Sequence, residues 1–154
     1  MDSKSESPRY WIAVVAQDRA ERARDGGYAE LAHGRAGILE LMQPGDAYMT
    51  YSPRITDPKG EPVQAFTALG YVREGGIYRA SDAEGSPVFR LPMTYVPASL
   101  APIKPLLDTL TFIRNRQHWG AAFRFGGLRI LPADFARIAA AMGYDATAEQ
   151  ARAA

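Results

Sequence analysis

The chain has 154 residues and a formal net charge of +1; 47% of its residues are hydrophobic and 23% are charged, a balance typical of one globular domain rather than a disordered or fibrous chain. Cysteine is absent, which excludes disulfides, a thiolate nucleophile and Cys-ligated metal sites. No apolar run reaches the roughly 20 residues of a membrane span, and the polar start lacks a signal-peptide core, so we expect a cytoplasmic protein.

The first half of the chain predicts three strands and two short helices. The apolar run at 10–16 is typical of a buried strand. Asp18 can cap a helix that continues to Arg24 and stops at two glycines. Residues 38–42 are expected to form one or two helical turns. Two further strands are predicted at 47–51, ending at Ser52 and Pro53, and at 64–73.

The second half predicts a hairpin, short strands and a terminal helix. Gly75 and Gly76 are expected to turn the chain into a strand at 77–79, and a strand at 88–96 carries Pro92, which favours an edge or a bulge. A helical turn, a short strand and a helix with one apolar face follow at 102–107, 128–131 and 133–142. Because strands and helices do not alternate regularly, we expect a mixed β-barrel with small helices around it.

Basic and aromatic residues gather in one part of the sequence. Between Ile103 and Leu131 there are five basic residues and one acid, whereas the rest of the chain has a net charge of −3. Fifteen of the 18 basic residues are arginines, whose guanidinium groups pair with phosphates and stack on flat rings. The charge pattern alone fits both a polyanionic partner and a solvated arginine-rich surface.

Residues suited to catalysis or metal binding are few. His33 and His118 lie in no ligand-spacing motif, and the chain has no nucleophile elbow, phosphate-binding loop or dinucleotide-binding fingerprint. His33 has a side chain that can act as a general base near neutral pH, although a loop histidine bonded to backbone or water is the simpler interpretation. We therefore expect no enzyme, no metal and no cofactor.

Aromatic residues fit base binding better than they fit catalysis. A flat base is held by stacking, worth about 1–3 kcal/mol per base, together with polar contacts to its edge and cations at its phosphates. Candidate walls of such a pocket are Trp11, Tyr51, Phe112 and Trp119. Trp11, in an apolar strand, fits a core residue equally well.

Seven segments occur in the order found in EVE-domain proteins: RYWIAVV, HGRAG, DAYMTYSPR, QAFTALGYV, VFRLPMTYVP, PIKPLLDTLTFIRNRQHWG and FRFGGLRILPADFARIAAAM. The chain resembles the small single-domain bacterial branch of that family. The resemblance predicts one domain over 9–142, with 1–8 and 143–154 as flexible termini. It implies an α+β fold, a PUA-like pseudo-β-barrel of about five to six strands with surrounding helices, similar to YTH and ASCH domains.

The same resemblance implies a non-catalytic pocket for a flipped base that carries a methyl or hydroxymethyl group, in DNA rather than RNA. The expected partner is therefore nucleic acid, with no membrane involved; the sequence does not determine the oligomeric state, for which a monomer is the default. The alternative is a small hydrolase or transferase, or a binder of a nucleotide-like small ligand.

The resemblance also assigns residues to this site. The base pocket takes Trp11, His33, Gly34, Tyr51, Ser52, Phe112, Asn115 and Trp119, and the phosphate contacts take Arg35, Arg114, Arg116 and Arg124. Two departures from the family pattern stand out: Arg35 replaces an expected Lys, and the loop at 57–62 is longer.

Overall fold

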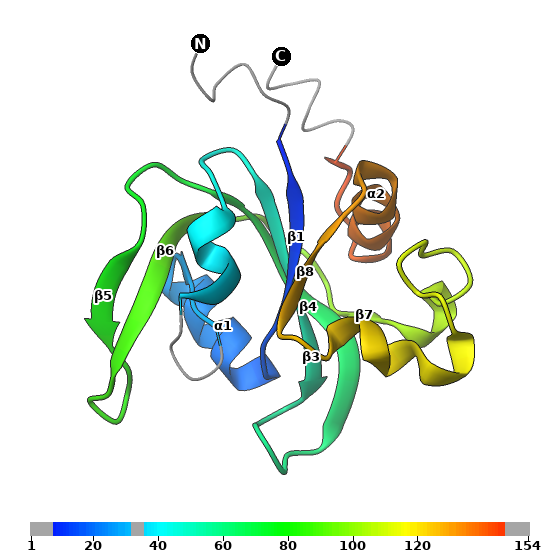
Figure 1. Ribbon diagram of the computed structural model, residues 1–154, viewed down its shortest axis with the longest axis horizontal. Helices are drawn as coiled ribbons and strands as arrows, with labels where there is room; N and C mark the ends of the chain where they lie inside the picture. The colour runs from blue at the N-terminus through cyan, green and yellow to red at the C-terminus, as the bar shows by residue number, and fades with distance from the viewer. Residues whose placement is uncertain (1–7, 32–35, 147–154) are drawn as a thin grey trace.

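The computed structural model describes residues 8–31 and 36–146, which form an α+β fold around one mixed sheet (Figure 1). The main path of the sheet runs in the order β2 (Tyr28–Ala29), β6 (Pro87–Tyr95), β4 (Pro62–Val72), β3 (Ala47–Arg54), β1 (Tyr10–Val14) and β8 (Gly127–Ile130). Two shorter strands, β5 (Tyr78–Ser81) and β7 (Ala101–Pro102), pair with β6 and β4. The predicted PUA-like pseudo-barrel is confirmed, with six strands on its main path.

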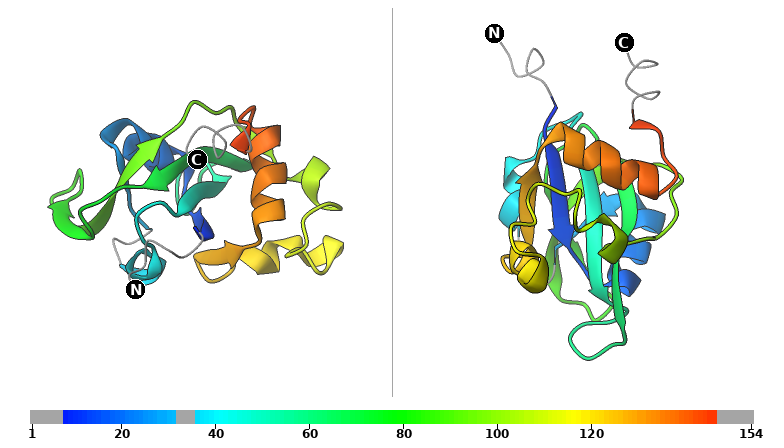
Figure 2. Two further views of the ribbon diagram at one scale, coloured as in Figure 1. Left: turned by 90° about the horizontal axis from the view of Figure 1, so that it is seen from above. Right: turned by 90° about the vertical axis from the view of Figure 1, so that its right-hand side faces the viewer.

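β1 and β3 run parallel, whereas the other strand pairs are antiparallel. The helices are α1 (Gln17–Gly26), α2 (Pro132–Ala141) and the 3-10 helices η3 (Gly37–Leu41), η4 (Lys104–Leu106) and η5 (Arg116–Phe123). α1 and α2 lie on opposite sides of the sheet (Figure 2).

The alternation of side chains along β1 divides the core into two clusters. Tyr10 and Ile12 face the cluster that includes Phe135 of α2, whereas Trp11 and Ala13 face the cluster that contains α1 and η3. Successive residues of a strand point to opposite faces of a sheet, so neighbours in this strand belong to different cores. The first cluster continues to Ala146, beyond the domain boundary predicted at Met142.

Two predicted boundaries differ from the structure. β3 continues past Ser52 to Arg54, because Pro53 falls at an irregularity of the β3–β4 ladder, where its missing N–H costs no regular pairing. α1 begins at Gln17 after Ala16, with no side-chain cap; Asp18 instead lies in the first turn, where its charge suits the helix dipole.

The glycine pair at 75–76 does not join β4 and β5 into a hairpin. The end of β4 already pairs with β6, in which Val72 lies opposite Met93 and the Arg73 N–H donates to the Pro92 carbonyl (2.9 Å). β5 therefore pairs with the other half of β6, where Tyr78 lies opposite Arg90. Among the described residues, no helix is both long and apolar enough to cross a membrane.

Candidate functional site

A hollow of about 620 Å³ opens where β1 ends. Four stretches that are far apart in the sequence contribute to its lining, which consists of Val14, Val15, Ala16, Leu31, Gly37, Ile38, Leu41, Pro53, Asp57, Phe123, Arg124, Phe125 and Gly126. Most of these side chains are apolar. The volume lies in the usual range of small-molecule pockets, so the hollow can accept a group as large as a nucleobase.

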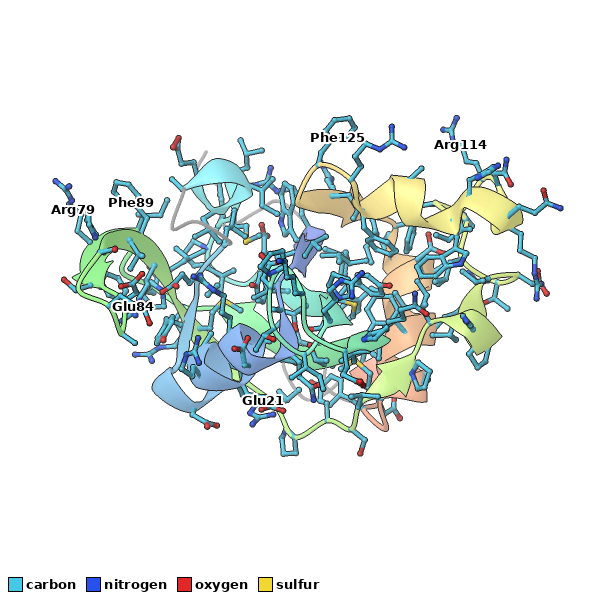
Figure 3. The ribbon with its side chains drawn as sticks, turned by 90° about the horizontal axis from the view of Figure 1, so that it is seen from below. Glu21, Arg79, Glu84, Phe89, Arg114 and Phe125 are labelled. Carbon is cyan, nitrogen blue, oxygen red and sulfur yellow. The ribbon has the colours of Figure 1, made fainter. Side chains whose placement is uncertain are left out.

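One side of the hollow is the turn that joins η5 to β8. The Arg124 N–H donates to the Ala121 carbonyl (3.3 Å), and the Gly126 carbonyl accepts a hydrogen bond from the Val14 N–H (2.9 Å). Gly126 has a φ of 86°, a left-handed conformation that glycine adopts without steric cost. These bonds fix the backbone on both sides of Phe125, whose side chain is 88% exposed. Figure 3 shows Phe125 and Arg114 extending outward along the same edge of the molecule.

Another side of the hollow is formed by Leu31 and η3. A Cβ atom at Gly127 of β8 would lie only 2.4 Å from Cδ1 of Ile38, so the absence of a side chain there lets η3 pack directly against β8. The predicted pocket residues His33 and Gly34 and the predicted phosphate contact Arg35 lie outside the described residues. Among the described residues near that part of the sequence, Leu31 and Gly37 line the hollow.

An aromatic cluster supports the η5 side of the hollow from within the core. Phe123 stacks on Tyr51 with ring centroids 4.1 Å apart and an interplanar angle of 11°. Phe112 and Trp119 meet Phe123 edge-on at 6.0 and 6.4 Å, and Trp119 also meets Tyr51 edge-on at 6.3 Å. Phe66 completes the cluster. Of these rings, Phe123 is the one that also lines the hollow.

The structure thus brings together three of the predicted pocket residues, Tyr51, Phe112 and Trp119, as the packed support of Phe123. Tyr51 is only 2% exposed, and burial raises the pKa of its hydroxyl above the ordinary tyrosine value. None of the three is part of the lining.

Trp11 and Ser52 lie elsewhere. Trp11 is buried in the cluster on the opposite face of the sheet, and its indole N–H donates to Asp46 (3.0 Å). Ser52 is fully buried, and its hydroxyl shares a hydrogen bond with that of Thr67 (2.8 Å), which also bonds the Thr50 hydroxyl (2.7 Å). Both predicted pocket residues therefore have structural partners away from the lining.

Asn115 caps η5. Its side-chain oxygen accepts hydrogen bonds from the backbone N–H groups of Gln117 (3.0 Å) and His118 (3.3 Å), which satisfies donors that a helix start leaves unpaired. The amide oxygen of Asn115 therefore has a structural role at the start of η5.

The predicted phosphate contacts differ in their surroundings. Arg124 lines the hollow, and Arg114 is exposed. Neither forms an ion pair with any residue that the structure describes. Arg116 instead pairs with Asp108, so its charge is already partly compensated.

Among the described residues, Asp57 is the one carboxylate in the lining, and sequence reasoning did not single it out. Its loop is closed by hydrogen bonds from Arg54 to the Gly60 carbonyl (2.9 Å) and from the Gly60 N–H to the Thr56 carbonyl (2.9 Å). The Asp18 N–H donates to the Ile55 carbonyl (3.0 Å) and ties the loop to α1. The longer loop noted in the sequence is thus held against the fold, with its acid at the hollow.

Phe123 and Phe125 were also missed as lining residues. The motif FRFGG places both rings beside a basic residue and two glycines, a signal that could have indicated them, but it does not tell which ring is buried. Within 8–31 and 36–146, no three His, Asp or Glu side chains are grouped so that they could hold a metal ion.

Comparison with known proteins finds close relatives of similar length. The chain is 40% identical over 146 residues to the UPF0310 protein msl3206 of Mesorhizobium japonicum, covering 94% of this chain and 98% of that protein. It is 37% identical over 134 residues to the UPF0310 protein YdcG of Bacillus subtilis, covering 87% and 92%. No protein-family profile matches the chain.

Two crystal structures share the fold. Protein Atu2648 from Agrobacterium tumefaciens superposes with a TM-score of 0.55 at 10% identity, over 90% of this chain and 95% of that one. Protein PSPTO5229 from Pseudomonas syringae superposes with a TM-score of 0.54 at 16% identity, over 85% and 97%. At these identities the likeness concerns the fold alone.

Proposed function

The chain belongs to the UPF0310 family, the EVE-domain family, and on this basis we propose that it is a non-catalytic nucleic-acid-binding module that holds a modified base in the hollow at the end of β1. The proposed ligand is DNA carrying a methylated or hydroxymethylated base. The observation that carries the proposal is the apolar hollow of about 620 Å³, bordered by a buried phenylalanine, an exposed phenylalanine and an arginine without an ion-pair partner among the described residues.

The lining matches what an extruded base requires. A base that leaves its stack loses a few kcal/mol, which contact with aromatic and apolar groups can offset. Phe123 offers such a surface, and its stacking on Tyr51 fixes its position. A methyl group on the base gains about 1–3 kcal/mol from a close apolar wall, so the preference for a modified base should be moderate.

Asp57 supplies polar selectivity in this proposal. An ionised carboxylate only accepts hydrogen bonds, and carboxylates accept from the exocyclic amino group of cytosine. The same oxygens repel the keto oxygen that thymine has at that position. We therefore favour cytosine and other amino-bearing bases as the occupants of the hollow.

The charge around the η5 segment suits a phosphate backbone. Residues 111–131 contain four arginines and no acid, and Arg114 and Arg124 remain without a carboxylate partner among the described residues. The proposal includes no catalytic step, since the sequence has no nucleophile elbow, phosphate-binding loop or dinucleotide-binding fingerprint. A nucleotide-like small ligand is the alternative that the experiment must separate.

The test is fluorescence anisotropy with matched DNA and RNA oligonucleotides that carry cytosine, methylated cytosine, hydroxymethylated cytosine or methylated adenine, each at two salt concentrations. The proposal expects tighter binding to one modified DNA, together with affinity that falls as salt rises because neutralised phosphates release counterions. Equal affinity for all oligonucleotides would contradict a modified-base pocket. No binding to any of them would favour a small ligand.

A matched pair of variants tests the arginine assignment. Arg124→Gln should lower the salt dependence by about 0.7–0.9 in the slope of log affinity against log salt, the contribution of one phosphate contact. Arg79→Gln is the control, because Arg79 lies on β5, at the far end of the molecule from Arg114 (Figure 3). An equal change in both variants would show only a generic effect of net charge.

A further inference from the structure

Phe125 is the most exposed large apolar side chain among the described residues, at 88%. The apolar surface of a phenyl ring would lower the free energy if it were buried, and it does not do so while the ring is in water. Lone exposed apolar residues need no special explanation, but this ring borders the hollow and stands beside Arg124. Its place at the proposed site is the reason to ask what it contacts.

The backbone presents this ring rather than leaving it loose. Hydrogen bonds to Ala121 and from Val14 hold the residues on either side of Phe125, and the left-handed Gly126 reverses the chain directly after it. Phe123, two residues earlier, is 7% exposed and packs into the aromatic cluster. The two rings therefore lie in different environments: Phe123 is buried and supports the hollow, whereas Phe125 is exposed and extends past its rim.

We infer that Phe125 is a second stacking platform, which receives the base adjacent to the one held in the hollow. This inference rests on the proposed function and narrows the ligand from a nucleoside or mononucleotide to a strand with at least one neighbouring base. Bases stack on exposed aromatic side chains with little sequence preference. The arginines on the same segment favour a polyanion as the occupant. They favour it over a protein surface that is uncharged or that has few acidic residues.

The positions of Phe123, Arg124 and Phe125 set a simple requirement on the path of the nucleic-acid strand. Adjacent bases share one phosphate, and Arg124 stands in sequence between the ring that lines the hollow and the ring that extends from it. A strand whose modified base enters the hollow and whose neighbour covers Phe125 would carry its linking phosphate past this arginine. Phosphate, base and neighbouring base then each meet a different residue of the 123–125 turn.

The experiment uses the full chain and the tightest-binding oligonucleotide of the panel above, prepared as a pentanucleotide. A second pentanucleotide keeps the modified base and all phosphates but has abasic residues at both flanking positions. The wild-type protein should bind the abasic strand roughly 5- to 150-fold more weakly, the range expected from losing one base–aromatic stack. Phe125→Ala should bind both strands with similar, reduced affinity.

Leu131→Ala is the control, because Leu131 is also exposed (58%) but does not line the hollow. This variant should keep the wild-type difference between the two strands. If Phe125→Ala still distinguishes the strands as the wild type does, the stacking role is wrong even where the preference for a modified base persists. A third outcome is that Phe125→Ala removes the difference between the two strands while the wild type binds modified and unmodified bases with equal affinity. The base-pocket proposal then fails and the stacking platform stands. A wild-type protein that binds neither strand overturns both.

Discussion

Phe123 connects the core to the hollow, and its removal gives the sharpest test of the packing. The ring is 7% exposed, stacks on Tyr51 and meets Phe112 and Trp119 edge-on. Replacing a buried phenylalanine by alanine costs about 3–5 kcal/mol. We expect Phe123→Ala to fall in the upper part of that range, because three rings lose their partner.

A companion variant separates ring geometry from burial. Phe123→Leu keeps most of the apolar volume but loses three aromatic pairs, each worth about 0.5–1.5 kcal/mol beyond area, so a loss of about 1.5–4.5 kcal/mol is expected. The assay is urea unfolding followed by far-ultraviolet circular dichroism and tryptophan fluorescence, with the slope compared between variants. Since domains are stable by only about 5–15 kcal/mol, the alanine variant should be close to unfolding. A loss below about 1 kcal/mol for alanine would refute the packing argument.

Three further predictions concern single side chains. Thr67→Val should destabilise the fold by about 2–4 kcal/mol in urea unfolding, because two buried hydroxyls lose their shared partner. Burial raises the pKa of Tyr51, so the folded state keeps a proton that the unfolded chain releases, and the free energy of unfolding should fall as pH rises above about 10. Tyr51→Phe should lessen that fall in urea unfolding followed from about pH 8 to about pH 11, and an unchanged pH dependence would contradict this reasoning. Asp57→Asn should reduce the preference for cytosine over thymine at the bound base by about 1–3 kcal/mol in anisotropy, whereas Glu61→Gln in the same loop should leave it unchanged.

Much of the fold follows from periodicity. The apolar run at the start of the chain forms β1, and the residues spaced along one face of α2 pack into the core. The pairing of β5 was less accessible, because a glycine pair signals only a local turn. Whether β4 or β5 occupies a given part of β6 depends on competition between these two strands for the same partner, which a local turn signal does not record.

The candidate site could likewise be predicted from the sequence only in part. The aromatic and basic character of 111–131 was visible in the sequence, and Arg124 does line the hollow. Trp11 and Tyr51 look alike as candidate walls, yet they face different cores. The parallel register of β1 and β3 places Trp11 beside Tyr48, and both belong to one cluster while Tyr51 belongs to the other. Strand parity would have separated them, but only with the register known.

The lining of the hollow has a practical consequence, because its four stretches, far apart in the sequence, meet only when the chain has folded. An unfolded chain has no such cavity, so any ligand that fills it stabilises the folded state in proportion to its occupancy. A ligand at a hundred times its dissociation constant adds about 2.7 kcal/mol, which for a domain of this size raises the melting temperature by roughly 5–10 °C. Melting curves recorded against a library of modified nucleosides and short strands would therefore reveal the ligand without any label or assumed chemistry.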